Sequence, residues 1–113
     1  MNKVLITGAC GFIGSHLTEY FANKKFKVIA YDKYNSNGNL GWLQNNSKVS
    51  KVKVILGDIN DFSLTNKIIK EVDYIIHLAA LISIPYSYNS PLSYIKTNVE
   101  GTYNILELSL IHI

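Results

Sequence analysis

Arginine is absent from this 113-residue chain, and cysteine occurs only once. Without arginine, no side chain can make the forked, bidentate grip on a phosphate that this residue type offers. The single cysteine, Cys10, excludes a disulfide framework and a cysteine metal cluster, and it fits a reducing compartment. We expect Cys10 to be a small spacer between glycines rather than a catalytic thiol, and we expect no metal site.

Long apolar runs are also missing, since none approaches the ~20 residues that a membrane-spanning helix needs. The first residues, MNKVLIT, enter a predicted strand directly and lack the layout of a signal peptide. The eleven lysines are scattered, so the formal net charge of +3 indicates a solvated surface rather than a nucleic-acid interface. We therefore expect a cytoplasmic protein with neither a membrane anchor nor a nucleic-acid partner.

The composition is that of a globular domain, with 48% hydrophobic and 17% charged residues. A length of 113 residues allows one domain at most, and it is long enough for a hydrophobic core.

The most informative stretch is an apolar run, Val4 to Thr7, followed by Gly8, Gly11 and Gly14. This pattern predicts a strand, a tight turn and a helix over Phe12–Asn23. Glycines permit the turn, the approach of a ligand to the backbone, and close helix packing. Unpaired amides at the helix start favour an anion, and a diphosphate is the expected one. The alternative is a glycine-rich loop that merely turns the chain.

A second predicted strand, Lys27–Tyr31, ends in Asp32, eighteen residues after Gly14. An acidic residue at this distance, at the tip of the second strand, is placed to accept hydrogen bonds from the hydroxyls of a ribose. Its position therefore favours a dinucleotide site over a simple turn.

The rest of the chain alternates predicted strands and helices. These are a loop over Lys33–Ser50 with a short helix near Leu40–Gln44, a strand at Lys51–Leu56, a helix capped by Asp61, a strand at Tyr74–Leu78, and a helix opened by Ser90 and Pro91. We expect Ile95, Val99, Thr102 and Leu106 to supply one face of the last helix.

Four strands alternating with helices imply parallel pairing with right-handed crossovers. We therefore predict an α/β fold, the N-terminal part of a Rossmann-type doubly wound parallel sheet with strand order 3-2-1-4. Its crevice would lie at the carboxyl ends of strands 1 and 4, where Gly8 to Gly14, Asp32, Asp58 and Leu78 to Leu81 converge. A flavodoxin-like or other nucleotide-binding sheet is the alternative.

Several motifs occur in an order that is typical of one family. Thr7 to Gly14, TGACGFIG, resembles the TGxxGxxG fingerprint of extended short-chain dehydrogenases/reductases, the NAD-dependent epimerase/dehydratase family. Gly57-Asp58-Ile59, His77-Leu78-Ala79-Ala80 and Asn98-Val99-Glu100-Gly101-Thr102 resemble further motifs of that family. The resemblance covers Lys3 to Glu107.

The resemblance implies NAD as cofactor and assigns roles to the motif residues. Phe12 and Ile13 would lie over the diphosphate, Asp32 would hold the adenosine ribose, and Asn98 would reach toward the nicotinamide side. Asp58 and Ile59 would flank the adenine. The full set of expected cofactor-binding residues is Gly8, Gly11, Phe12, Ile13, Gly14, Asp32, Asp58, Ile59, Leu78, Ala79, Ala80, Leu81 and Asn98.

Structural alternatives remain open for three residues. Asp58 could cap a helix, and Asn98 could be a solvent-facing helix residue. We interpret His77 as structural, since no acid or thiol near it in the sequence is visible as a partner for its imidazole.

A narrower likeness covers YNSNGNLGWLQN and ALISIPYSYNSPLSYIKTNVEGT, which look like sugar-nucleotide 4,6-dehydratases of the branch that makes legionaminic acid precursors. It implies a nucleotide-sugar substrate, with Ser83, Tyr86 and Tyr88 as candidate contacts. Relatives commonly dimerise through the helix that here begins at Ser90, so a homodimer is expected of the intact protein.

One departure from the family is large, because its catalytic Ser/Thr and Tyr-x-x-x-Lys motif follow the region present here. Tyr20 and Lys24 have the right spacing but lie on the first predicted helix, so we interpret them as a coincidence. The chain is thus expected to be the N-terminal cofactor-binding part of an NAD-dependent 4,6-dehydratase, inactive alone. A 4-epimerase and a non-catalytic NAD(H)-binding module are the alternatives.

The last six residues, LSLIHI at 108–113, depart from the family's helix and look like the translation of a transposon-end adapter used in sequencing libraries. We expect residues 1–107 to be a partial NAD(P)-binding Rossmann domain and residues 108–113 to be a non-native tail.

Overall fold

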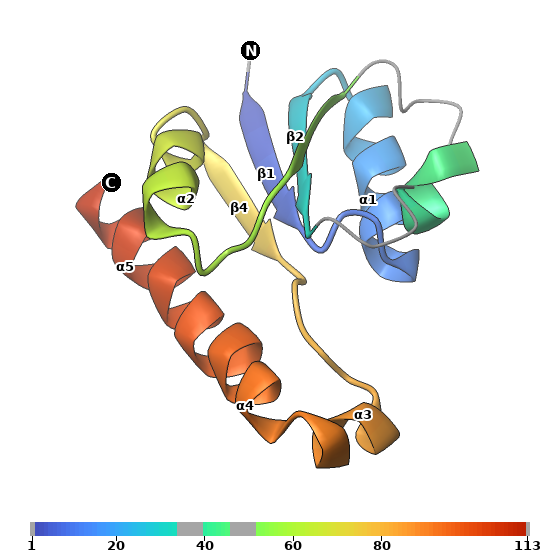
Figure 1. The fold of residues 1–113 in the computed structure, drawn as a ribbon. Helices are drawn as coiled ribbons and strands as arrows, with labels where there is room; N and C mark the ends of the chain where they lie inside the picture. Colours follow the sequence, from blue (N-terminus) through green and yellow to red (C-terminus); the bar gives the residue numbers. More distant parts are fainter. Residues whose placement is uncertain (1, 34–39, 46–51, 113) are drawn as a thin grey trace.

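The computed structural model describes residues 2–33, 40–45 and 52–112. In this part of the chain, strands form a parallel sheet in the order β3-β2-β1-β4, which confirms the predicted topology (Figure 1). The strands are β1 (Lys3–Thr7), β2 (Lys27–Asp32), β3 (Lys53–Leu56) and β4 (Tyr74–His77).

The helices cover both faces of the sheet, as a parallel sheet requires. They are α1 (Phe12–Asn23), the 3₁₀-helix η1 (Gly41–Asn45), α2 (Phe62–Ile69), α3 (Ile84–Asn89), α4 (Pro91–Tyr94), a π-helical stretch (Ile95–Gly101) and α5 (Thr102–Ile111). Figure 1 shows α1 and the green η1 on one side of the sheet, and α2 and α5 on the other.

Successive side chains of β1 point to opposite faces of the sheet and contribute to the hydrophobic core on each face. Val4 and Ile6 pack with the side chains of α1, whereas Leu5 packs with those of α2 and α5. All three are at most 1% exposed, so each face of this central strand is covered. The register places Thr7 beside both Tyr31 and His77, so the ends of β1, β2 and β4 lie close together.

Some predicted boundaries differ from the structure. The third strand begins at Lys53 rather than Lys51, which lies outside the described residues, and the fourth ends at His77 rather than Leu78. The short helix expected near Leu40–Gln44 is η1, while residues 34–39 and 46–51 of the predicted loop lie outside the described part. Asp61 caps α2 as predicted, because its carboxylate accepts a hydrogen bond of 3.1 Å from the Leu64 amide.

The last helix packs through residues other than those that the spacing assigned to one face. Ile95, Val99 and Leu106 are 52%, 62% and 60% exposed, and the buried residues are instead Gly101, Ile105 and Leu108. Both sets recur at helical spacing, so they lie on different faces of the same helix, and the face that packs is the one with Gly101, Ile105 and Leu108. α5 continues through Leu108 to Ile111, and the His112 ring lies 2.7 Å from Asn66 Oδ1.

No helix among the described residues is both long enough and apolar enough to cross a membrane.

Candidate functional site

A cleft of about 580 Å³ opens at the carboxyl ends of β1, β2 and β4. All the predicted cofactor-binding residues line it except Asn98, and the lining also includes Tyr31, Lys33, Ile82 and Thr97. Sequence reasoning did not assign those four to the site. Lys33 and Tyr31 flank Asp32, so their place at the tip of β2 was the signal that could have found them.

The glycine turn has no room for side chains at two of its positions. Gly8 has a φ of +68°, and a Cβ there would lie 2.8 Å from the carbonyl carbon of Leu78. A Cβ at Gly14 would lie 2.1 Å from the carbonyl oxygen of Gly8. Glycine therefore lets the chain reverse after β1 and lets α1 begin close to the end of that strand.

The start of α1 presents unpaired amides to the cleft. Gly11 is the N-cap and offers no side-chain cap, and the Ser15 amide makes a 2.9 Å bond to the Gly11 carbonyl. The amides of Phe12, Ile13 and Gly14 make no hydrogen bond to any described residue. Such a helix start favours an anion, through free donors and through the helix dipole.

Asp32 fastens the glycine turn to the tip of β2. Its Oδ2 accepts a 2.8 Å hydrogen bond from the Cys10 amide, and its Oδ1 accepts one of 2.7 Å from the Lys33 amide. An ionised carboxylate has about four acceptor positions, and these two amides together with the Cys10 thiol use up to three of them, so at least one remains for a ligand. Burial, with the charge of Asp32 adding to it, raises the pKa of the Cys10 thiol to about 11. Cys10 is therefore a neutral thiol, which fits its interpretation as a spacer.

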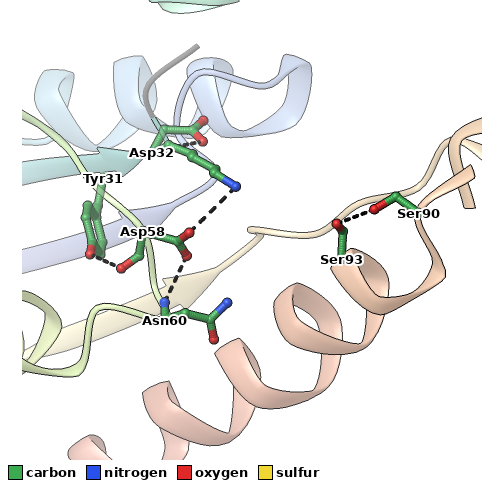
Figure 2. A network of polar contacts seen from close by, with 7 residues as sticks. Tyr31, Asp32, Asp58, Asn60, Ser90 and Ser93 are labelled. Carbon is green, nitrogen blue, oxygen red and sulfur yellow. Dashed lines mark hydrogen bonds and ion pairs between the residues drawn. The ribbon is translucent and has the colours of Figure 1, made fainter. Parts of the chain in front are cut away.

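Asp58 is held from several sides at the wall of the cleft (Figure 2). The Tyr31 hydroxyl donates a 2.8 Å hydrogen bond to the Asp58 carbonyl, and the Thr65 hydroxyl lies 3.0 Å from the Tyr31 oxygen. The Asp58 carboxylate accepts a 2.9 Å bond from the Asn60 amide and lies 3.6 Å from Lys33 Nζ. Burial raises the pKa of Tyr31, so the phenol stays protonated and keeps donating.

Asp61, and not Asp58, is the N-cap of α2. Asp58 lines the cleft instead, so it does not have the alternative role of a helix cap.

The floor of the cleft, Leu78 to Leu81, is tied down at both ends. The Thr7 hydroxyl oxygen accepts hydrogen bonds from the amides of Leu78 (2.9 Å) and Ala79 (3.1 Å). Asn98 bonds the backbone of Leu81 twice, with its Oδ1 2.8 Å from the amide and its Nδ2 2.9 Å from the carbonyl. Asn98 thus contacts the floor segment rather than lining the cavity.

His77 has the partners that the sequence did not reveal. Its Nδ1 lies 2.7 Å from Thr7 Oγ1, and its Nε2 lies 3.0 Å from Thr102 Oγ1. Burial lowers its pKa, which favours the neutral imidazole.

The candidate substrate residues lie outside the cleft lining, before or within α3. The Ser83 carbonyl accepts a hydrogen bond from the Tyr94 hydroxyl, and the Tyr86 ring centroid lies 5.8 Å from that of Tyr94. Tyr88 is 82% exposed. Most of the Asn35–Trp42 loop, which carried part of the likeness to dehydratases, lies outside the described residues.

The described residues contain no cluster of three or more His, Cys, Asp or Glu that could hold a metal ion.

Three features together define a Rossmann-type nucleotide-binding half-domain. They are a parallel sheet of order 3-2-1-4, a glycine turn with free amides at the start of the following helix, and an acidic residue at the tip of the second strand. The sequence agrees, since residues 5–112 match the family profile described as GDP-mannose 4,6 dehydratase. The chain belongs to this family of the NAD-dependent epimerases and dehydratases, which confirms the expected resemblance.

Individual relatives include both kinds of enzyme. The chain is 37% identical over 112 residues to the dTDP-D-glucose 4,6-dehydratase of Dictyostelium discoideum, covering 95% of this chain and 26% of the relative. It is 33% identical over 111 residues to UDP-glucuronate 4-epimerase 2 of Arabidopsis thaliana, covering 94% of this chain and 26% of the relative.

Among solved structures, DesIV, a dTDP-glucose 4,6-dehydratase from Streptomyces venezuelae crystallised with NAD bound, superposes with a TM-score of 0.83 at 28% identity. That match covers 97% of this chain and 36% of DesIV. The chain thus spans about a quarter to a third of the length of these relatives.

Proposed function

We propose that the cleft binds NAD and that the chain is the N-terminal, cofactor-binding part of a sugar-nucleotide enzyme. The observation that carries this proposal is the joint placement of two complementary groups on one cleft. The free amides at the start of α1 suit a diphosphate, and the Asp32 carboxylate, which keeps acceptor capacity beyond its bonds to the protein, suits a ribose diol.

Different residues of the cleft would contact different parts of the cofactor. The amides of Phe12 and Ile13 would donate to the diphosphate, Asp32 would accept from the adenosine ribose, and Asp58 and Ile59 would flank the adenine. Leu78 to Leu81 would support the cofactor from beneath. NAD supplies a nicotinamide that accepts and returns a hydride.

A calorimetric titration with fragments of the cofactor tests this proposal. Because Asp32 and the amides at the start of α1 suit the adenosine diphosphate half, ADP-ribose should bind in a saturable, one-to-one manner, and nicotinamide mononucleotide should bind far more weakly. The reverse order of affinities, or no saturable binding of NAD or ADP-ribose, would contradict it.

The same residues favour NAD over NADP. Asp32 would repel a 2′-phosphate, and the chain has no arginine to receive one. Lys33 follows Asp32 directly in the chain, but its Nζ lies 3.6 Å from Asp58 Oδ2. The pair is exposed and weak, so it reduces rather than abolishes the ability of Lys33 to receive a phosphate.

For the intact protein we propose 4,6-dehydration of a nucleotide-linked hexose, in the branch that makes legionaminic acid precursors. The reaction would oxidise C4 of the sugar, eliminate water across C5 and C6, and return the hydride to C6. Its support is the sequence likeness around Ser83 to Tyr88 and the dehydratases among the relatives. A 4-epimerase, which returns the hydride to C4, is the second candidate, because epimerases are also among the relatives.

Product analysis separates these reactions. Intact enzyme incubated with GDP- and UDP-linked N-acetylglucosamine should give a 4-keto-6-deoxy sugar. Clean interconversion of gluco and galacto forms without loss of water would show an epimerase instead.

This chain alone should be inactive, because it lacks the family's catalytic motif. Tyr20 lies on α1 and Lys24 is the C-cap residue of that helix; the Lys24 ammonium sits 5.5 Å from the centre of the Tyr20 ring, and neither residue lines the cleft. A coding frame that continues past Ile113 with Tyr-x-x-x-Lys supports the enzyme. A frame without it favours the third candidate, a non-catalytic NAD(H)-binding module.

We also propose that the intact protein is a homodimer that uses the exposed stripe of its last helices. This stripe comprises Ile95, Val99, Tyr103, Leu106 and Leu110, each at least 52% exposed. Their spacing keeps them on one helix face, and such a surface is stable in water when a partner covers it. Light scattering of the intact protein should give the mass of two copies, whereas a monomer at micromolar concentration would contradict this assignment.

A further inference from the structure

The Thr7 hydroxyl is the junction of a buried hydrogen-bond relay beneath the proposed cofactor. Thr7 is fully buried, and its oxygen accepts from the amides of Leu78 and Ala79 at 2.9 and 3.1 Å. The same oxygen lies 2.7 Å from His77 Nδ1, and His77 Nε2 lies 3.0 Å from Thr102 Oγ1.

The geometry fixes the direction of every proton in this relay. A hydroxyl has two acceptor positions and one proton, and the two backbone amides occupy both acceptor positions of Thr7. The proton of Thr7 must therefore be donated to His77 Nδ1. Nδ1 is then unprotonated, so the neutral ring carries its proton on Nε2 and donates it to Thr102.

We propose that His77 is a positioning residue for the proposed NAD site, on whose existence this inference rests. By accepting the proton of Thr7, His77 directs both acceptor positions of that hydroxyl toward the amides of Leu78 and Ala79. The floor of the cleft is thereby held against the glycine turn, where a Cβ on Gly8 would come within 2.8 Å of Leu78.

The relay makes the last helices part of the cofactor site. Thr102 holds the far side of His77, and Asn98, four residues earlier, holds Leu81 through two hydrogen bonds. The floor is therefore fixed near Leu78 by the relay and at Leu81 by Asn98. A displacement of α5 would move both points together.

Two substitutions at His77 separate the effect of its hydrogen bond to Thr7 from the effect of the space that its side chain fills. His77→Asn places an amide oxygen near the position of Nδ1 and can still accept from Thr7, whereas His77→Leu is apolar and leaves the buried Thr7 proton without an acceptor. We expect His77→Leu to weaken NAD binding about tenfold, the equivalent of one buried hydrogen bond, and His77→Asn to restore most of the affinity. Equal affinities for wild type and a folded Leu variant would overturn the proposal.

Two readouts on the protein without cofactor complete the test. Nitrogen NMR of the imidazole should show the tautomer with Nδ1 unprotonated and Nε2 protonated in the wild type. Thr102→Ser should keep this tautomer, whereas in Thr102→Val a smaller fraction of the rings should adopt it. Hydrogen exchange at the Ala79 amide should be faster in His77→Leu than in His77→Asn, whereas the Leu78 amide also donates to the Thr7 carbonyl at 3.2 Å and should change less. A ring protonated at Nδ1, or exchange that is the same in both variants, would overturn the relay.

These readouts also distinguish this inference from the proposed function. If the wild type binds no NAD, the assignment of the cleft fails, and the positioning role for that cofactor fails with it. If the wild type binds NAD but the tautomer or the exchange pattern is wrong, the cleft assignment stands and only the positioning role is overturned.

Discussion

Substitution of Asp32 is predicted to weaken NAD binding by two separable routes. Asp32→Ala removes the acceptors for the ribose hydroxyls, and it also leaves the Cys10 amide of the glycine turn without its 2.8 Å partner. Asp32→Asn keeps one carbonyl oxygen that can accept from that amide, but it loses the charge and one acceptor. The alanine variant should therefore be the weaker binder of the two.

The magnitude follows from the free acceptor positions of the carboxylate. The amides of Cys10 and Lys33 and the thiol of Cys10 use up to three of about four, which leaves at least one for the ribose. Hydrogen bonds to a charged group contribute about 1.5–3 kcal/mol each before losses from imperfect geometry and competition with water. We expect a net cost of about 1–3 kcal/mol for Asp32→Ala, which is roughly a 5- to 150-fold rise in the dissociation constant.

Titration calorimetry with NAD and NADP measures both parts of this prediction. Glu71→Ala serves as the matched control, because it removes an exposed carboxylate outside the cleft lining. The preference for NAD should shrink in both Asp32 variants, since the repulsion of the 2′-phosphate is gone and Lys33 can turn toward it. A folded Asp32→Ala protein with unchanged NAD affinity, or a wild type that binds NADP as tightly as NAD, would refute the assignment.

Four further predictions concern other parts of the chain. The Cys10 thiol, with its pKa raised to about 11, should react with iodoacetamide at pH 8 roughly a hundred times more slowly than free cysteine, and a comparable rate would contradict its burial. Burial lowers the pKa of His77, so this ring should stay neutral in the folded protein at a pH where the unfolded chain protonates it. The free energy of unfolding should therefore decrease as the pH falls through the ordinary pKa of histidine, and it should not change with pH above that pKa. An NMR titration that gives His77 an ordinary or raised pKa would contradict this. The isolated chain should be marginally stable and prone to aggregate, because β4 is an edge strand of the described sheet with Tyr74 and Phe26 near an apolar groove; a sharp, concentration-independent thermal transition of a monomer would argue against it. Finally, genomic DNA of the native organism should diverge from this sequence after Glu107, and codons for LSLIHI running on in the genome would disprove a foreign tail.

The strand order and the cleft were predictable because their determinants are local in the sequence. The apolar run into Gly8, the acid at Asp32 and the small residues after β4 each specify their own strand end. Parallel pairing then brings the strand ends together without further information. The residues that line the cleft are for this reason nearly the ones that the motifs named.

What the sequence did not reveal depends on contacts between distant residues. The partners of His77 are separated from it by 70 and 25 positions, and the two bonds from Asn98 to Leu81 span 17. The packing face of the last helix escaped prediction because two sets of residues recur at helical spacing along it, and only the fold shows that Ile105 and Leu108 are the buried ones. The role of Gly101 is similar, since only the fold shows that a Cβ there would lie 2.2 Å from Ile59.

Mapping the amide resonances of the protein during an NAD titration shows whether this cleft is an NAD site. We expect saturable shifts that are largest at Gly11, Phe12 and Ile13, at Cys10 beside Asp32, and along Leu78 to Leu81. The ends of α2 and α5 farthest from the cleft should change little. An absence of shifts at millimolar NAD, or saturable shifts confined to residues outside the cleft, would contradict the account.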